Sequence, residues 1–203
     1  MSTPHTSSPR GDVRAAKQAL REELLARRRA RPVAERESLE QAVAWHLLAD
    51  GRISRARRVA AYRSMPTEPG TAALLEALVG RGVEVVVPVV VGEHLDWTVH
   101  VPDAPTRTSA LGVAEPSGAR LGPGAVRSAD VVVVPALAVD HAGRRLGRGA
   151  GYYDRALQDV SVPVVALLHA DELLPEVPAE PHDVRVQMVV TETGVFRVPQ
   201  ESG

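Results

Sequence analysis

The residues whose types and spacing could do chemistry lie mainly in one glycine-rich stretch. Four glycines recur over 143–151, and the stretch ends at Asp154. Glycines at this spacing leave backbone N–H groups open to a ligand, and a helix that follows them adds unpaired N–H groups and a positive dipole end. Arg144, Arg145 and Arg148 could pair with phosphate oxygens, and Asp154 could hold a magnesium ion against them. The stretch is therefore a candidate phosphate site.

A purely structural interpretation of the same stretch stays open. It contains no Gly-Lys-Ser/Thr of a Walker A loop, and Tyr152 interrupts the dinucleotide-binding pattern GxGxxG. The glycines could serve only a turn, and Asp154 could simply complement the dipole of the helix that follows. Spacing alone does not decide between an anion site and a turn.

A second group of cations begins with Lys17 and Arg21, which would share one face of a helix because they are four residues apart. Alone, such a pair is usually a solvated basic face. Lys17 is, however, the only lysine among 24 basic residues, and the chain has only three tyrosines, Tyr62, Tyr152 and Tyr153. We expect a solvated helix end to carry the next four arginines: Arg27, Arg28, Arg29 and Arg31.

The elements that must position these residues follow from hydrophobic periodicity. Three- and four-residue steps predict helices over 13–30, with Asp12 as the N-cap, and over 33–49, 71–80 and 152–159. Apolar or alternating runs predict strands over 58–62, 83–87 (ending at Pro88), 97–101, 131–134, 162–168, 188–191 and 196–198. Residues 102–128 are rich in Pro, Gly, Ser and Thr and predict an irregular loop.

The order of these elements predicts the fold class. Two helices followed by alternating strands and helices indicate an α/β protein with an N-terminal helical pair. Its sheet would be open and mostly parallel, flanked by helices in a three-layer, Rossmann-like arrangement. Ligands of such sheets bind at the carboxyl ends of the strands, where the glycine-rich stretch would lie.

Length and composition restrict the classes of function. The chain has 203 residues, a net charge of −1 and no cysteine. This composition gives no overall field for nucleic acid or an anionic membrane, and it excludes a disulfide scaffold and a cysteine nucleophile. No apolar run is long enough to cross a membrane, and the first residues resemble no secretory signal. We expect a cytoplasmic protein with a disordered tail over 1–11, a single α/β domain over 12–198 and a tail over 199–203.

The glycine-rich stretch resembles a long family signature. From Pro135 to Asp154 it matches P-x4-D-x2-G-x-R-L-G-x-G-x-G-Y-Y-D, the signature of the 5-formyltetrahydrofolate cyclo-ligases, also called 5,10-methenyltetrahydrofolate synthetases. Further segments resemble this family in order and spacing. They are Lys17–Arg21 (K-x-x-L-R), Tyr62–Thr71 (aromatic-x-S-x-x-x-E-x-x-T), Leu111–Pro116 (G-I-x-E-P) and His182–Glu192 (H-D-x-x-V-x-x-V-V-T-E). The resemblance extends over about residues 13–192.

The resemblance implies an enzyme that converts 5-formyltetrahydrofolate to 5,10-methenyltetrahydrofolate, with ATP as co-substrate, Mg²⁺ as cofactor, and ADP and phosphate as products. The implied ATP-binding residues are Lys17, Arg21, Arg145, Leu146, Gly147, Arg148, Gly149, Ala150, Gly151, Tyr152 and Tyr153. The implied folate-binding residues are Tyr62, Arg63, Met65, Glu68, Arg148, Gly149, Gly151 and Tyr152. Arg148 and Tyr153 would be catalytic, and Asp154 would hold the magnesium ion. Glu68 would accept hydrogen bonds from the pterin, although it could also be the acid that precedes a helix.

Two positions depart from the family's pattern. Many members have lysine in place of Ala150 and aspartate in place of Gln187, so this site would lack one cation and one carboxylate. A non-catalytic folate- or nucleotide-binding relative therefore remains an alternative, as does a sugar-phosphate-binding enzyme of similar fold. The expected partners are 5-formyltetrahydrofolate and ATP, with no nucleic acid and no membrane, and the chain is expected to be a monomer.

Overall fold

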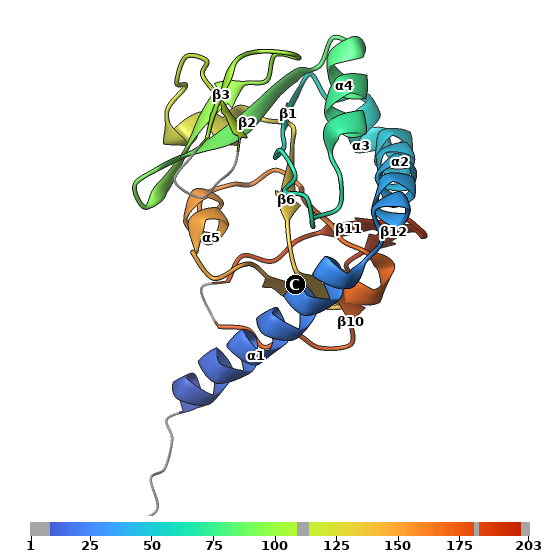
Figure 1. The fold of residues 1–203 in the computed structure, drawn as a ribbon. Coiled ribbons are helices and arrows are strands. Elements are labelled where there is room, and N and C mark those ends of the chain that lie inside the picture. The colour runs from blue at the N-terminus through green and yellow to red at the C-terminus, as the bar shows by residue number, and fades with distance from the viewer. Residues whose placement is uncertain (1–8, 109–113, 181–182, 200–203) are drawn as a thin grey trace, which may run out of the picture.

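The computed structural model describes residues 9–108, 114–180 and 183–199. Its main sheet has seven strands in the order β12-β11-β9-β6-β1-β2-β3 (Figure 1). In chain order they are β1 (Arg58–Ala60), β2 (Glu84–Val91), β3 (His94–Val99), β6 (Val131–Pro135), β9 (Val164–Leu167), β11 (Met188–Thr191) and β12 (Gly194–Arg197). The five inner strands pair in parallel, and the edge strands β3 and β12 are antiparallel. The predicted open, mostly parallel sheet is confirmed.

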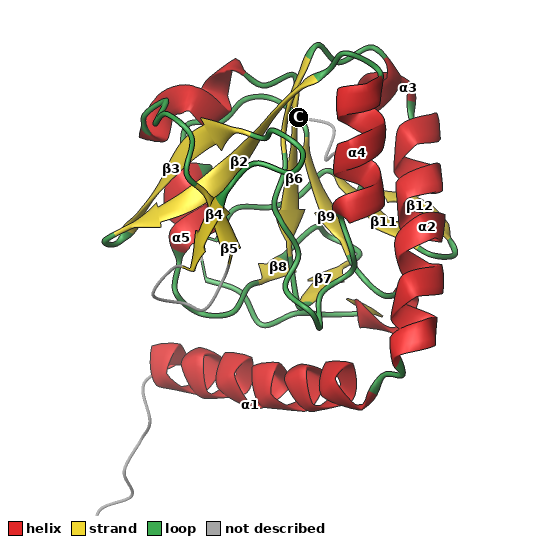
Figure 2. Cartoon of the chain, turned by 45° about the horizontal axis from the view of Figure 1, so that its top comes forward, coloured by secondary structure: helices red, strands yellow, loops and turns green. Residues whose placement is uncertain are grey.

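Helices cover both faces of this sheet (Figure 2). One face carries α2 (Val33–Ala49), α3 (Gly51–Ser54) and α4 (Ala72–Gly80), and the other carries α5 (Tyr152–Ala156) and the 3₁₀-helix η1 (Pro123–Ser128). Along β6, Val131 and Val133 pack into the first core, whereas Val132 and Val134 pack into the second. A strand covered on both faces needs apolar residues at every position, which explains its unbroken run of valines.

The first helix, α1 (Pro9–Ala30), lies across the carboxyl ends of the parallel strands, apart from the two helical layers (Figure 2). Its apolar stripe is fixed by Leu24, which is fully buried with Leu137 and Leu146 in a third core cluster. The helix begins four residues earlier than predicted, and Asp12 lies in its first turn instead of capping it. None of the described helices is both long and apolar enough to span a bilayer.

Several boundaries differ from the sequence prediction. Strand β2 continues through Pro88 to Val91, because β1 pairs only with Glu84–Val86 and leaves β2 a single neighbour, β3, at the proline. Helix α5 ends at Ala156, three residues before its predicted end. The predicted irregular loop over 102–128 is wrong in part, since it holds η1 and the pair β4 (Thr106–Thr108) and β5 (Ala114–Pro116). Strands of three residues are too short to show a periodic pattern.

A second small sheet, also missed from the sequence, lies beside the carboxyl ends. It consists of β10 (Leu173–Leu174), β7 (Ala138–Asp140) and β8 (Arg145–Leu146), and β10 follows the 3₁₀-helix η2 (Ala170–Glu172). Strands β7 and β8 pair antiparallel, with Gly143 in the turn between them, and Gly147 follows β8 directly. This small sheet therefore sets where the later glycines of the stretch lie.

Candidate active site

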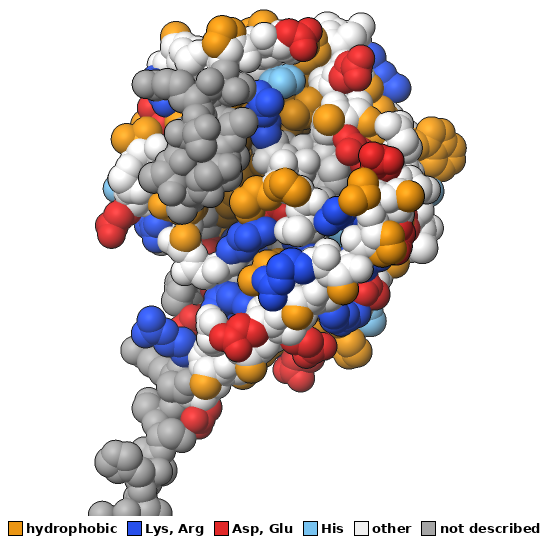
Figure 3. Space-filling view, in the orientation of Figure 1, with side chains coloured by type: hydrophobic (Ala, Val, Ile, Leu, Met, Phe, Trp, Pro, Cys, Tyr) orange, Lys and Arg blue, Asp and Glu red, His pale blue; other side chains and the backbone are white. Residues whose placement is uncertain are grey.

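A cavity of about 500 Å³ opens between α1 and the carboxyl ends of the strands. Basic side chains gather on the face that α1 crosses, with acidic ones between them (Figure 3). Every residue that the resemblance implied for ATP, folate or magnesium lies on the cavity wall. These residues are Lys17, Arg21, Tyr62, Arg63, Met65, Glu68, Arg145, Leu146, Gly147, Arg148, Gly149, Ala150, Gly151, Tyr152, Tyr153 and Asp154. Three segments far apart in the sequence thus converge on one space.

A buried carboxylate holds the start of the glycine-rich stretch. Asp140 is fully buried, and its Oδ1 accepts hydrogen bonds from the backbone N–H groups of Ala142 and Arg144 at 2.9 and 3.0 Å. A side chain at Gly143 would meet the Val186 carbonyl oxygen at 2.4 Å, so only glycine fits there. These residues shape the turn and do not line the cavity.

The later glycines form the part of the wall that faces α1. Arg21 Nε donates a hydrogen bond to the Gly147 carbonyl oxygen at 2.9 Å, which ties the helix to the stretch. Gly151 has a φ of 68° at the start of α5, a conformation that favours glycine. Gly149 and Ala150 are exposed at the cavity wall. The exposed backbone of this segment leaves room for an anion, and the anion site stays a prediction.

Lys17 is buried and already paired. Its Nζ donates hydrogen bonds to Glu180 Oε2 at 2.8 Å and to Asp183 Oδ2 at 2.6 Å. Burial alone would lower the pKa of Lys17, but the two carboxylates outweigh it and raise this pKa above its ordinary value. The lysine therefore stays charged, and it offers the cavity an ammonium group whose charge is shared with two carboxylates.

Arg145 and Asp154 form a second paired group. Arg145 is 5% exposed, and its guanidinium donates to Asp154 Oδ1 at 2.6 Å and to the Pro135 carbonyl oxygen at 3.3 Å. The same guanidinium lies 5.9 Å from the centre of the Tyr153 ring. No group of three His, Asp or Glu side chains that could hold a metal ion occurs among the described residues. A magnesium ion at Asp154 would thus rely on water and phosphate for its other ligands.

Glu68 occupies the opposite wall, in the segment that follows β1. It is 6% exposed, and its Oε2 accepts a hydrogen bond from the Met65 N–H at 2.8 Å. Arg148 reaches it only weakly, with Nε 3.3 Å from Oε1, and a further contact to Thr67 Oγ1 measures 3.5 Å. A carboxylate is therefore held inside the cavity, with an arginine that can leave it at small cost.

Two tyrosines beside Glu68 keep their protons. Burial, and next the charge of Glu68, raise the pKa values of Tyr62 and Tyr153 well above their ordinary value. The Tyr62 hydroxyl contacts the Pro69 carbonyl oxygen at 3.4 Å, and the Tyr152 hydroxyl contacts that of Gly92 at 3.3 Å. Tyr62 and Tyr153 can thus serve as hydrogen-bond donors but not as bases.

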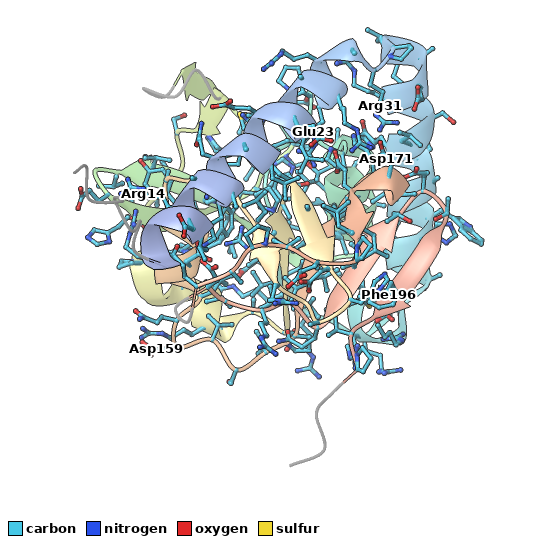
Figure 4. All side chains as sticks on the ribbon, turned by 90° about the horizontal axis from the view of Figure 1, so that it is seen from below. Arg14, Glu23, Arg31, Asp159, Asp171 and Phe196 are labelled. Atoms are coloured by element: carbon cyan, nitrogen blue, oxygen red, sulfur yellow. The ribbon has the colours of Figure 1, made fainter. Side chains whose placement is uncertain are left out.

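Arg28 is a cavity residue that the sequence prediction placed wrongly on a solvated helix end. It is 1% exposed, and it forms a two-pronged ion pair with Glu172, with distances of 2.6 and 2.7 Å. It also donates to the Ala136 carbonyl oxygen at 2.6 Å. Its position one helical turn after Leu24 could have indicated a buried face. A separate ion pair follows the end of α1. Figure 4 shows Arg31 close to Asp171 of η2, and the ion pair between them measures 2.9 Å.

The two departures from the family pattern differ in location. Ala150 lies on the cavity wall, whereas Gln187 does not. Gln187 precedes β11 at its amino end, and its Oε1 accepts a hydrogen bond from the Val164 N–H at 2.7 Å. Gln187 therefore lies outside the cavity lining, and the expectation that it removes a carboxylate from the site stays a prediction. The motif residues 111–113 and His182 lie outside the described residues.

Comparisons with known proteins agree on one family. The model of the 5-formyltetrahydrofolate cyclo-ligase family matches residues 13–192. The 5-formyltetrahydrofolate cyclo-ligase of Mycolicibacterium smegmatis is 41% identical over 185 residues, which cover 87% of this chain and 93% of that protein. The mouse protein of the same name is 26% identical over 206 residues, covering 89% of this chain and 95% of its own length.

Solved structures give the same result. The NMR structure of the 5,10-methenyltetrahydrofolate synthetase of Aquifex aeolicus superposes with a TM-score of 0.80 at 28% identity, covering 92% of this chain and 95% of that one. The corresponding synthetase of Mycoplasma pneumoniae, at 21% identity, shares the fold with a TM-score of 0.70 and covers 87% of this chain and 98% of its own.

Proposed function

The chain belongs to the 5-formyltetrahydrofolate cyclo-ligase family, and on that premise we propose that it uses ATP and Mg²⁺ to convert 5-formyltetrahydrofolate to 5,10-methenyltetrahydrofolate. A formamide carbon is a weak electrophile, and its oxygen is a poor leaving group. The reaction therefore needs a phosphoryl donor held beside the formyl group. The observation that carries the proposal is the single cavity shared by α1, the Tyr62–Glu68 segment and the glycine-rich stretch.

The nucleotide would lie on the side of the cavity formed by α1 and the glycine-rich stretch. The backbone N–H groups of 147–151 suit phosphate oxygens, and Arg21 holds this backbone through Gly147. Arg148 is the cation best able to reach a phosphate, because its contacts to Glu68 and Thr67 are long and its side chain is 39% exposed. We therefore assign to Arg148 the stabilisation of negative charge on the transferred phosphoryl group.

The folate would lie on the side formed by the segment after β1. The Glu68 carboxylate suits the amino and ring N–H groups of a pterin, which donate hydrogen bonds along one edge. Apolar residues of the neighbouring strands, Pro88, Val90 and Leu95, line the same cavity and suit the flat ring system. When Arg148 turns to the phosphates, Glu68 becomes free to accept hydrogen bonds from the substrate.

The chemistry would proceed by two substitutions. The formyl oxygen attacks the γ-phosphorus of ATP and ADP leaves, which makes the formyl carbon iminium-like. N10 then attacks this carbon and loses its proton, and the C–O bond breaks to release phosphate. Tyr153 keeps its proton and can donate a hydrogen bond to an oxygen that gains charge. The protein supplies position and charge and needs no nucleophile of its own.

The described cavity residues fit a magnesium ion that takes one protein carboxylate, that of Asp154. Mg²⁺ often takes one or two protein carboxylates and completes its octahedron with water and substrate phosphates. Asp154 lies on the cavity wall, paired with Arg145 through Oδ1, and it is the residue that would hold the ion. The ion would neutralise charge on the phosphates of ATP.

An absorbance assay tests this function. The protein is mixed with 5-formyltetrahydrofolate, ATP and magnesium, and methenyltetrahydrofolate and ADP are followed together. We expect both products to form at equal rates and only when all three components are present. Binding of both substrates without turnover would instead favour the non-catalytic relative, which Ala150 and Gln187 motivate.

A further inference from the structure

Helix α1 holds the cavity wall at two points on one of its faces. Near its middle, Arg21 Nε donates a hydrogen bond to the Gly147 carbonyl oxygen at 2.9 Å. About two turns later, Arg28 Nη2 donates one to the Ala136 carbonyl oxygen at 2.6 Å. Leu24 lies between the two arginines on the same face and is fully buried. One helix face therefore holds the backbone of two separate segments.

The two segments are also joined to each other. The Leu137 N–H donates to the Leu146 carbonyl oxygen at 2.7 Å, and Gly147 is the next residue along the chain. Three hydrogen bonds thus form a closed circuit, which runs from the helix through 136–137 and 146–147 and back to the helix. A displacement of the Arg28 guanidinium is therefore passed along this backbone to Gly147, where the proposed phosphate-binding segment begins.

The orientation of the Arg28 guanidinium is set from outside the cavity. The two carboxylate oxygens of Glu172 accept its Nε at 2.6 Å and its Nη2 at 2.7 Å. Oε2 of Glu172 also accepts the His169 N–H at 3.0 Å, so η2 holds the carboxylate in place. A planar guanidinium held at two nitrogens points its other Nη2 proton in one direction, and the Ala136 carbonyl lies there. Because Arg28 is only 1% exposed, it acts through this backbone and not on a ligand.

Resting on the proposed function, we propose that Arg28, oriented by Glu172, is a positioning residue of the reaction. It sets where the backbone N–H groups after Gly147 stand, and these groups are the ones assigned to the phosphates of ATP. Phosphoryl transfer depends on alignment, so a displacement of about 1 Å can cost a factor of about 100 in rate. The folate side of the cavity, formed by the segment after β1, lies outside the circuit. We therefore expect the loss of Arg28 to affect the nucleotide and to leave the folate bound as before.

Calorimetry on the full chain tests this role with two probes, a non-hydrolysable ATP analogue with magnesium and 5-formyltetrahydrofolate. Arg28→Lys keeps the positive charge that acts on Glu68, but it loses the planar fork that Glu172 holds. Kd for the ATP analogue should rise about tenfold, and Kd for the folate should change by less than about twofold. Arg29→Lys changes an exposed arginine of the same helix and should alter neither value. Equal losses for the two probes, or no loss for the ATP analogue, would overturn the proposal.

A destabilised variant elsewhere in the chain separates positioning from stability. Asp50 is buried away from the cavity, where it accepts the Arg52 N–H at the start of α3 and pairs with Arg197. Asp50→Ala removes both contacts and should lower the urea midpoint, yet leave both Kd values unchanged. If Asp50→Ala weakens the ATP analogue as much as Arg28→Lys does, the positioning role of Arg28 is rejected.

A second variant covers the case in which Arg28→Lys does not fold. Glu172 is not among the described residues on the cavity wall, so Glu172→Gln has to act on the nucleotide through Arg28. It keeps one acceptor for the guanidinium, and Kd for the ATP analogue should rise about threefold while that for the folate stays constant. An unchanged Kd for the analogue in this variant also counts against the proposal.

The absorbance assay on wild type and Arg28→Lys keeps the two proposals apart. KM for ATP should rise in Arg28→Lys, whereas a smaller folded fraction would lower kcat and leave KM unchanged. Missing product in wild type, with the loss specific to the ATP analogue intact, rejects only the proposed reaction. Product in wild type without that specific loss rejects only the role of Arg28.

Discussion

Two walls of the same cavity hold their charges in different ways. On the wall made by α1, η2 and the segment after β6, Arg28 is buried and contacts Glu172 at 2.6 and 2.7 Å. On the wall made by the segment after β1, Arg148 contacts Glu68 at 3.3 Å and is partly exposed. The first kind of pair fixes the backbone around it, whereas the second can be exchanged for a ligand. Similar residue types thus serve structure on one wall and binding on the other.

The largest expected effect is on the tightly paired wall. Arg28→Ala leaves Glu172, which is 2% exposed, without its cation and frees the Ala136 carbonyl oxygen. Removing one partner of a buried ion pair costs about 3–5 kcal/mol of unfolding free energy. Urea unfolding followed by circular dichroism measures the loss. Arg29→Ala, which changes an exposed arginine of the same helix, should stay within about 0.5 kcal/mol of wild type. A loss of equal size in both variants would contradict the structural role of the buried Arg28–Glu172 pair.

A second effect on this wall depends on pH. His169 is 1% exposed, and its ring nitrogens have no hydrogen-bond partner among the residues that the structure describes. Burial, with the charges of Arg31 and Arg28, lowers its pKa to about 4. Because the unfolded chain binds this proton near pH 6.5, stability is full above that pH and is lost as the pH falls toward 4. The loss amounts to about 3 kcal/mol.

The pH effect is measured as the unfolding free energy between pH 7 and pH 4 in wild type and in His169→Phe. Other groups titrate in both proteins, so the difference between the two curves reports His169. We expect wild type to lose about 3 kcal/mol more than the variant over this range. Parallel curves would show that His169 does not lower stability on acidification.

On the loosely paired wall, substitution should affect activity and leave stability intact. Arg148→Ala should lower kcat/KM for ATP about 100-fold, as expected when a charge on the transferred phosphoryl group is lost. Its unfolding free energy should change by less than about 0.5 kcal/mol. Arg127→Ala is the matched control, because Arg127 is an exposed arginine with one exposed partner, Asp159, outside the cavity. A stability loss in Arg148→Ala as large as that of Arg28→Ala would show that Arg148 also stabilises the fold, and the contrast between the two walls would fail.

The sequence predicted the fold well, because burial leaves a clear pattern of apolar residues. The unbroken valines of β6 indicate a strand covered on both faces, and the periodic apolar residues of α2 and α4 indicate helices with one buried face. All the proposed site residues line one cavity, because the motifs carry the spacing of loops at the carboxyl ends of the strands, and their roles stay predictions. The sequence could not predict the partners of these residues. Arg28 looked solvated because its partner, Glu172, lies 144 positions later. Nothing in the sequence indicated that the Gln187 side chain contacts the Val164 N–H at the amino end of the sheet. Tertiary pairing between distant segments decides such cases.

A smaller effect on activity is expected at Asp154, which pairs with Arg145 and would also hold the magnesium ion. Asp154→Asn keeps an oxygen for Arg145 but removes the negative charge that we assign to magnesium. The magnesium concentration for half-maximal rate should rise about tenfold, which corresponds to about 1.4 kcal/mol. Magnesium titrations at saturating ATP and folate measure it. An unchanged requirement would leave Asp154 with only its structural contact to Arg145.

The smallest effect is expected at Gln187, whose hydrogen bonds within the described residues go to Val164, Arg185 and Val198. Gln187→Asp restores the residue that many relatives have, yet its side chain stands beside Val164 at the amino end of the sheet. A shorter side chain weakens the hydrogen bond to the Val164 N–H, so unfolding should become easier by about 1 kcal/mol. The magnesium requirement should not change, because residue 187 lies outside the cavity. The comparison with Asp154→Asn is direct, since both variants alter one carboxylate in the same titration. A lower magnesium requirement in Gln187→Asp would show that this position reaches the metal after all, and the site would then extend beyond the two walls described.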